Sequence, residues 1–186
     1  CHAVQAVAQF AADERFRSVL PEVGAMAPLT ALLSSHLPHV QQCALSAIAN
    51  VSFVPSAVAQ LAQSGCLAHL GQMLFGVSAA EGQTVLTSIS NILSASPAAA
   101  DSLLQVGGHM ALVTQLSSPA ADAQSQAAMA IGHMCRHAPA LTAMLQADTV
   151  PLLSKLLYSQ HPSAQLQAVY ALGVMAAEDE AAASAV

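Results

Sequence analysis

The segment MAPLTALLSSHLPHVQQCALSAIANVS, residues 26–52, is matched near the end of the chain by VPLLSKLLYSQHPSAQLQAVYALGVMA, residues 150–176. Each segment has a short apolar run rich in leucine, then a polar break with a proline. A longer run follows, in which apolar residues recur every three or four positions. That spacing is typical of helices with a buried face. The two segments therefore predict a medium helix followed by a long helix, present at least twice.

Two sets of marker residues show that this pattern has a fixed period. The first set precedes the medium helices and consists of Gly24, Gly65, Gly107 and Asp148. The second set ends the long helices and consists of Asn50, Asn91, His133 and Val174. Both sets advance by 41, 42 and 41 residues. A period of about 40–47 residues built from helices alone is typical of solenoids, so we expect an all-α protein made of stacked repeats.

Proline and glycine divide each repeat into a short, a medium and a long helix. In the second full repeat we expect these at about 55–63, 66–75 and 80–93. Pro55 can begin the short helix because the first turn does not need its missing N–H, and Gly65 can end it in the left-handed conformation. We expect a single array with a partial repeat at 1–23 and full repeats at about 24–64, 65–106, 107–147 and 148–186. Neither end resembles a polar cap, so we expect a piece of a longer array.

The composition argues against several classes of function. The chain has only four Lys and Arg residues and a net charge of −6, whereas nucleic-acid binding needs a cationic surface. No uninterrupted apolar run is long enough for a membrane span, and no signal peptide is visible. Cysteines 1, 43, 66 and 135 lie far apart in apolar helical segments, which favours reduced, buried thiols. We therefore expect a cytoplasmic protein that binds neither nucleic acid nor membrane.

The quoted segments resemble the armadillo family. They are similar to its x-P-x-L-x-x-L-L-x-S medium helix, which a long helix ending in A-L-x-N-L follows, and the glycine between the short and medium helices also matches. The resemblance implies an armadillo-type right-handed α-solenoid of three-helix repeats. It also implies a non-enzymatic scaffold that binds other proteins, within a larger assembly, on the concave face of its long helices.

The resemblance also suggests binding residues. In armadillo proteins of the nuclear-import type, a ladder of asparagines on the long helices binds the backbone of an extended peptide, and tryptophans one turn earlier hold lysines. The ladder positions here that carry polar side chains are Gln9, Asn50, Asn91 and His133, and Val174 follows them. The tryptophan positions hold Gln5, Ser46, Thr87, Met129 and Tyr170, so a basic import signal would lack its cation–π partners. The alternative is that each asparagine only caps the end of its own helix.

A second resemblance concerns AIGHMCRHAPALTAMLQADTVPLLSKLLY, residues 130–158. This segment is similar to armadillo repeats of the sperm-associated-antigen and central-pair proteins of motile cilia. The matching residues are Arg136, His137, Pro139, Pro151, Leu152, Leu153, Leu157 and Tyr158. It implies a structural role in the ciliary axoneme. The alternative is an adaptor for extended peptides, in nuclear import or signalling.

We find no candidate for catalysis or cofactor binding. His133, Cys135 and His137 suggest a metal site, but Cys135 lies about 200° around the helix from either histidine. Two ligands are too few for zinc. Phosphate-binding loops, nucleophile elbows and HExxH are absent from the sequence. We therefore expect no metal, no cofactor, no small-molecule substrate and no enzymatic activity.

Overall fold

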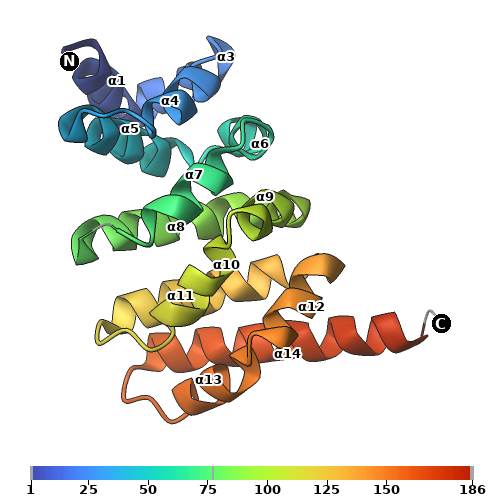
Figure 1. Cartoon of the computed structure of the whole chain (residues 1–186). Coiled ribbons are helices and arrows are strands. Elements are labelled where there is room, and N and C mark those ends of the chain that lie inside the picture. Colours follow the sequence, from blue (N-terminus) through green and yellow to red (C-terminus); the bar gives the residue numbers. More distant parts are fainter. Residues whose placement is uncertain (1, 77, 185–186) are drawn as a thin grey trace.

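The computed structural model describes residues 2–76 and 78–184. These residues form helices joined by short turns, and no strand occurs among them. The expected all-α class is therefore confirmed. Figure 1 shows the helices arranged as successive layers from the N-terminal to the C-terminal end, as in a solenoid.

The long helices form the spine of the array. They are α1 (His2–Ala12), α5 (Pro38–Val51), α8 (Ala79–Ala95), α11 (Ala121–Met134) and α14 (Pro162–Ser184). Each packs against the next in chain order, and they lie one above another in Figure 1. The medium helices are α4 (Met26–Leu32), α7 (Cys66–Met73), α10 (Gly108–Gln115) and α13 (Thr149–Leu156). They cross in front of the long helices in this view.

The short helices lie at one end of the long ones. They are α6 (Pro55–Gln63), α9 (Ala100–Gln105) with the preceding 3-10 turn η1 (Pro97–Ala99), and α12 (Ala138–Gln146). The first short helix is broken into α2 (Glu14–Arg17) and α3 (Val19–Glu22). Asp13 caps α2, because its carboxylate accepts the Arg15 backbone N–H at 3.0 Å and pairs with the Arg15 guanidinium at 2.8 Å.

In the second full repeat, α6 has the bounds expected from the sequence. The medium helix α7 ends two residues earlier than expected, and α8 is longer at both ends. Ser78 and Glu81 form a capping box that fixes the start of α8. The period of apolar residues thus located the helices, whereas local caps set their ends.

The core lies between the long helices and the medium and short helices that cover them. Ile48, Ile89 and Ile131 occupy the same position in α5, α8 and α11, and all three are fully buried. Removing such side chains from water is the main stabilising contribution. Because the same position is filled in each layer, the core continues from one repeat to the next.

Two medium helices approach closely through glycines. A Cβ atom added to Gly108 of α10 would lie 3.0 Å from the Cα atom of Gly71 in α7. It would also lie 2.6 Å from the Cδ1 atom of Leu103. The backbones of α7 and α10 can therefore approach this closely only where both residues lack a side chain.

The junction before each medium helix has a left-handed backbone. Gly24, Gly65 and Gly107 have φ of 71°, 75° and 69°, and Asp148 has φ of 51°. The expected equivalence of Asp148 with the glycines is confirmed. Aspartate is one of the few other residues that adopt this conformation at low cost.

We expect Gly65→Ala to destabilise the protein by about 1–2 kcal/mol, because a Cβ atom is strained in the left-handed region. Gly65→Asp should lose less, since Asp148 already occupies the equivalent junction. Steric clashes do not affect this comparison, because a Cβ atom at Gly65 meets nothing within 4 Å. Urea denaturation followed by circular dichroism measures both variants. Equal stability of the alanine variant and the wild type would contradict the backbone argument.

Candidate functional site

The four predicted ladder residues lie on four consecutive long helices. Gln9 is in α1, Asn50 in α5, Asn91 in α8 and His133 in α11. These helices pack in that order, so the residues form a row across the array. We call this row the ladder face. Gln9 is exposed and the other three are half-buried.

Asn91 links two repeats. Its Nδ2 donates to Ser52 Oγ at 2.9 Å, and Ser52 Oγ donates to the Ala49 carbonyl at 2.7 Å. Ser52 is buried at the end of α5, so the Asn91 amide fastens α8 to the preceding repeat. The alternative that this asparagine caps its own helix is wrong for Asn91. The Oδ1 atom of Asn91 forms no hydrogen bond to the described residues and can accept one from a partner.

His133 also bonds to a neighbouring repeat. Its Nδ1 lies 3.0 Å from the Tyr170 hydroxyl of α14, and the two rings meet edge to face with centroids 5.4 Å apart. Burial, helped by the positive charge of Arg136, lowers the pKa of His133 below its ordinary value. The imidazole is therefore neutral at pH 7. Tyr170 lies against Gly132, where an added Cβ atom would be 2.6 Å from the Cε1 atom of the ring.

Asn50 differs from Asn91 because its amide forms no hydrogen bond to any described residue. At the C-terminal end of α5, the Ser52 backbone N–H donates to the Ile48 carbonyl. The Asn50 side chain takes no part in this bond. Both the donor and the acceptor of Asn50 are thus available on a half-buried surface.

A hollow of about 260 Å³ lies beside Asn91, between α8 and the turn from α5 to α6. Its lining is Ser52, Phe53, Pro55, Val58, Asn91, Ser94 and Ala95. Phe53 is 63% exposed, so its ring is accessible to a partner at the edge of the hollow. Sequence reasoning missed Phe53 because the equivalent positions hold Ser94 and Arg136. The available signal was an aromatic residue three positions after a ladder asparagine, in a chain with few aromatics.

The three residues that suggested a metal site each have another environment. His133 contacts Tyr170, and His137 Nε2 lies 2.8 Å from an Asp101 carboxylate oxygen. Cys135 is fully buried, and burial raises the pKa of its thiol to about 12. Among the described residues, no three histidine, cysteine or acidic side chains are grouped to hold a metal ion. In the same part of the chain, every helix is too short or too polar to cross a membrane.

The sequence matches no family model and no curated protein. Among solved structures, computationally designed armadillo repeat proteins for modular peptide recognition match with a TM-score of 0.83 and 25% identity, over 95% of this chain and 75% of that chain. The chain has the armadillo-repeat fold. A designed armadillo repeat protein in complex with the peptide (KR)4 gives a TM-score of 0.80 at 24% identity, over 93% of this chain and 74% of that one. An engineered protein from a structural genomics consortium matches with a TM-score of 0.81 and 26% identity, over 94% of this chain and 72% of that chain.

The armadillo fold confirms the solenoid class that the sequence resemblance implied. It is a scaffold fold, in which stacked helices present long continuous surfaces to other proteins. The armadillo proteins named above are designed ones, and their names say nothing about a cilium. The resemblance to ciliary proteins therefore continues to rest on residues 130–158 alone.

Proposed function

We propose that this chain is a non-enzymatic scaffold that binds an extended segment of a partner protein along the ladder face. The observation that carries the proposal is the row formed by Gln9, Asn50, Asn91 and His133 on consecutive long helices. Amide side chains offer both a donor and an acceptor, which an extended backbone needs for its C=O and N–H groups. The peptide recognition named for the designed armadillo proteins supports this use of the fold.

The spacing of the row suits an extended chain. Packed helices lie about 8–10 Å apart, and an extended chain advances about 3.3–3.6 Å per residue. Successive ladder residues would therefore meet about every second or third residue of the partner. The same contacts would repeat along the segment, which favours an extended peptide over a compact ligand.

The side chains around the row favour a neutral, partly apolar segment. The hollow beside Phe53 offers an apolar wall next to the free Oδ1 of Asn91. Ser46, Thr87 and Met129 replace the tryptophans that hold lysines in import adaptors, and the chain contains no tryptophan. We therefore assign the apolar side chain of the partner to the Phe53 hollow.

Selection of short random peptides displayed on phage, followed by affinity measurement, tests the proposal. Asn50→Ala should weaken the selected peptides about fivefold through the loss of a hydrogen bond, without a change in melting temperature. Phe53→Ala should weaken the binding of these peptides more than Asn50→Ala does. Gln63→Ala, an exposed change at the end of α6, is the matched control. If binding survives both Asn50→Ala and Phe53→Ala, the ladder face is not the peptide site.

Asn91→Ala is a separate arm of the test, because it removes the bond to Ser52 as well as a peptide contact. We expect it to lower both the melting temperature and the peptide affinity. Asn50→Ala should lower the affinity alone. The pair of variants thus separates binding from the packing of repeats.

An axonemal scaffold is the second candidate, favoured by the ciliary phrase at residues 130–158. Two residues of that phrase join repeats, since Arg136 Nη1 donates to the Ser94 carbonyl at 3.4 Å and His137 pairs with Asp101. The packing of neighbouring repeats therefore explains why Arg136 and His137 occur in this segment, without a ciliary role for them. Expression of the tagged chain in ciliated cells tests this candidate, and a uniform cytoplasmic signal would count against it.

A further inference from the structure

A second hollow lies on the side of the array formed by the medium helices. It has a volume of about 460 Å³ and lies between the ends of α10 and α13 and the start of α11. Its lining is Leu116, Ser117, Gln124, Leu152, Lys155, Leu156, Tyr158, Ser159 and Gln160. We call it the Lys155 hollow. The ladder residues take no part in its lining.

The same hollow recurs two repeats earlier. A space of about 290 Å³ is lined by Leu33, Ser34, Gln41, His69, Gln72 and Met73. Each of these residues stands 83 positions before a residue of the Lys155 hollow, which is two repeat steps. The hollow is therefore a product of repeat geometry. The two copies differ in charge, because Gln72 stands where the later copy has Lys155.

One wall of each hollow is held by a glutamine. Gln124 Nε2 donates to the Ser118 carbonyl at 2.8 Å, and Gln41 Nε2 donates to the Leu33 carbonyl at 2.7 Å. These bonds fasten the turn between the medium and long helices to the start of the long helix. The wall is therefore in place before any partner binds, which lowers the entropic cost of binding.

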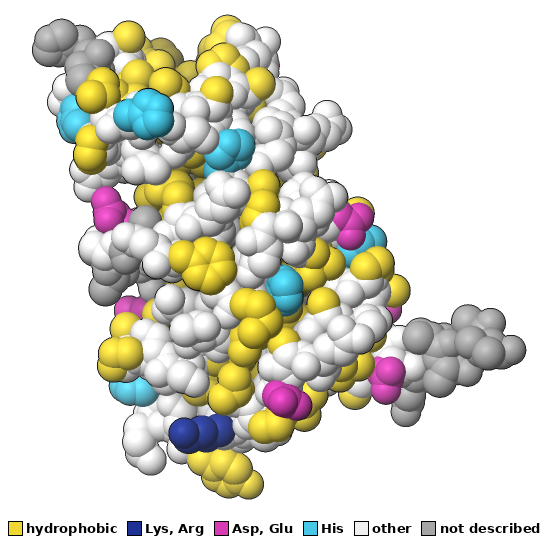
Figure 2. All heavy atoms as spheres, in the orientation of Figure 1, with side chains coloured by type: hydrophobic (Ala, Val, Ile, Leu, Met, Phe, Trp, Pro, Cys, Tyr) yellow, Lys and Arg dark blue, Asp and Glu magenta, His cyan; other side chains and the backbone are white. Residues whose placement is uncertain are grey.

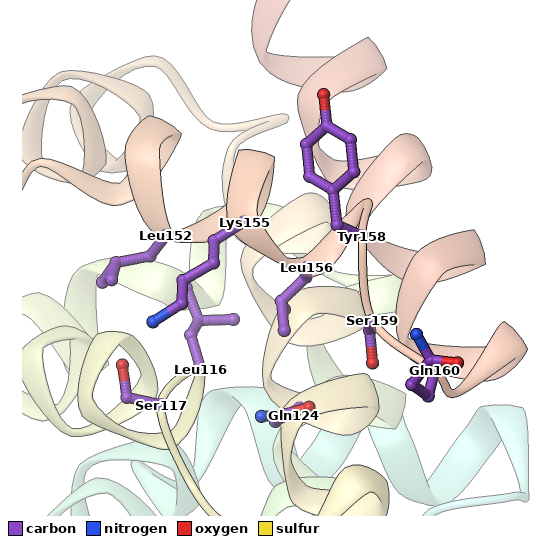
Figure 3. A pocket seen from close by; sticks show the side chains of 9 residues that line it. All are labelled: Leu116, Ser117, Gln124, Leu152, Lys155, Leu156, Tyr158, Ser159 and Gln160. Atoms are coloured by element: carbon purple, nitrogen blue, oxygen red, sulfur yellow. The ribbon is translucent and has the colours of Figure 1, made fainter.

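The Lys155 hollow combines an apolar floor with an unpaired positive charge. Figure 3 shows the Lys155 side chain running beside Leu116, with its amine on the side of Ser117, whereas the Tyr158 ring points outward. No carboxylate in the described part of the chain pairs with this amine. It is the only lysine of a chain with net charge −6. Figure 2 shows basic atoms over α13 beside hydrophobic side chains.

The rim of this side carries exposed aromatics at equivalent positions. Tyr158 is 85% exposed and Phe75, 83 residues earlier, is 63% exposed. Exposed aromatic side chains beside a hollow are typical of protein-binding surfaces. An apolar side chain of a partner could rest on the leucines and against Tyr158, while a carboxylate next to it reaches Lys155.

We propose that the Lys155 hollow binds an acidic segment of a partner protein, with an Asp or Glu carboxylate on Lys155 and a neighbouring apolar side chain on Leu116, Leu152 and Leu156. Charge complementarity selects this occupant, because a basic segment would face the ammonium group and a neutral one would leave it unpaired. The site is independent of the ladder face and adds a second surface to the scaffold.

Peptide selection on the wild type and on Lys155→Glu tests the proposal. Short random peptides displayed on phage are selected on each protein. Those recovered only on the wild type should be enriched in Asp or Glu beside an apolar residue. Fluorescence anisotropy of one such peptide should show about 2- to 5-fold weaker binding to Lys155→Met and at least about tenfold weaker binding to Lys155→Glu. Added salt should weaken the wild-type complex.

Gln72→Lys is the matched gain-of-function variant, because it places an ammonium group in the earlier hollow. Titration calorimetry should then show a second site for the acidic peptide. Asn50→Ala should leave this peptide unaffected, so failure of the ladder proposal and failure of this one can be told apart. Lack of acidic enrichment, or unchanged affinity in Lys155→Met, would overturn the proposal. Self-association that Lys155→Glu abolishes would instead assign the hollow to a second copy of this chain.

Discussion

Gly108→Val should be one of the most damaging single substitutions in this protein, with an expected loss of about 3 kcal/mol. The contact at issue is between the backbones of α7 and α10, where an added Cβ atom would lie 3.0 Å from the Gly71 Cα atom. The Leu103 side chain could rotate away from a valine, but the Gly71 backbone cannot move without shifting α7. The helices must separate, and the contacts around them are lost.

The matched control is Gly173→Ala, in the middle of α14. A Cβ atom there meets nothing within 4 Å, so the higher helix propensity of alanine should stabilise the protein by about 0.5–1 kcal/mol. Urea denaturation should show a lower free energy of unfolding for Gly108→Val and a higher one for Gly173→Ala. A Gly108→Val protein as stable as the wild type would mean that α7 and α10 are not held at this distance.

Ile89→Ala should destabilise the protein by about 2–5 kcal/mol, because it removes buried apolar volume from α8 in the middle of the array. Ile89 is fully buried, and 0% of its surface is exposed to water. The substitution would leave a cavity. Because α5 and α11 both pack against α8, the neighbouring repeats keep that cavity from collapsing. Urea denaturation followed by circular dichroism measures the loss.

The comparison variant is Leu172→Ala, at the equivalent position of α14. Leu172 is only partly buried against the core, so its loss should cost clearly less than the loss of Ile89. Equal losses at both positions would contradict a core that is tightest between interior repeats. The test thus measures how much stability comes from stacking on both sides.

The positions of the helices could be predicted from the sequence because they depend on local patterns. The apolar period, Pro55 and Gly65 located α6 to the residue. The break of the first short helix at Ser18, between α2 and α3, was not predicted. After the break, α3 packs against α6, which lies far along the chain, and no local pattern contains that contact.

The candidate site was predicted less well, for a physical reason. The row of ladder residues follows from the period, but the partners of those residues do not. Ser52 lies 39 residues from Asn91, and Tyr170 lies 37 residues from His133. Such pairs form only when repeats stack. The Lys155 hollow has the same origin, since its walls come from two different repeats.

The bonds of Asn91 and His133 give the ladder face a mechanical property. Each bond joins one long helix to the next, so the same side chains that would face a partner also fix the spacing of the helices. If a partner segment binds along this face as proposed, bending the array would change the distance between its successive contacts with that segment. A bound segment would therefore resist bending. The stiffness of the array and its affinity for the partner would then be coupled.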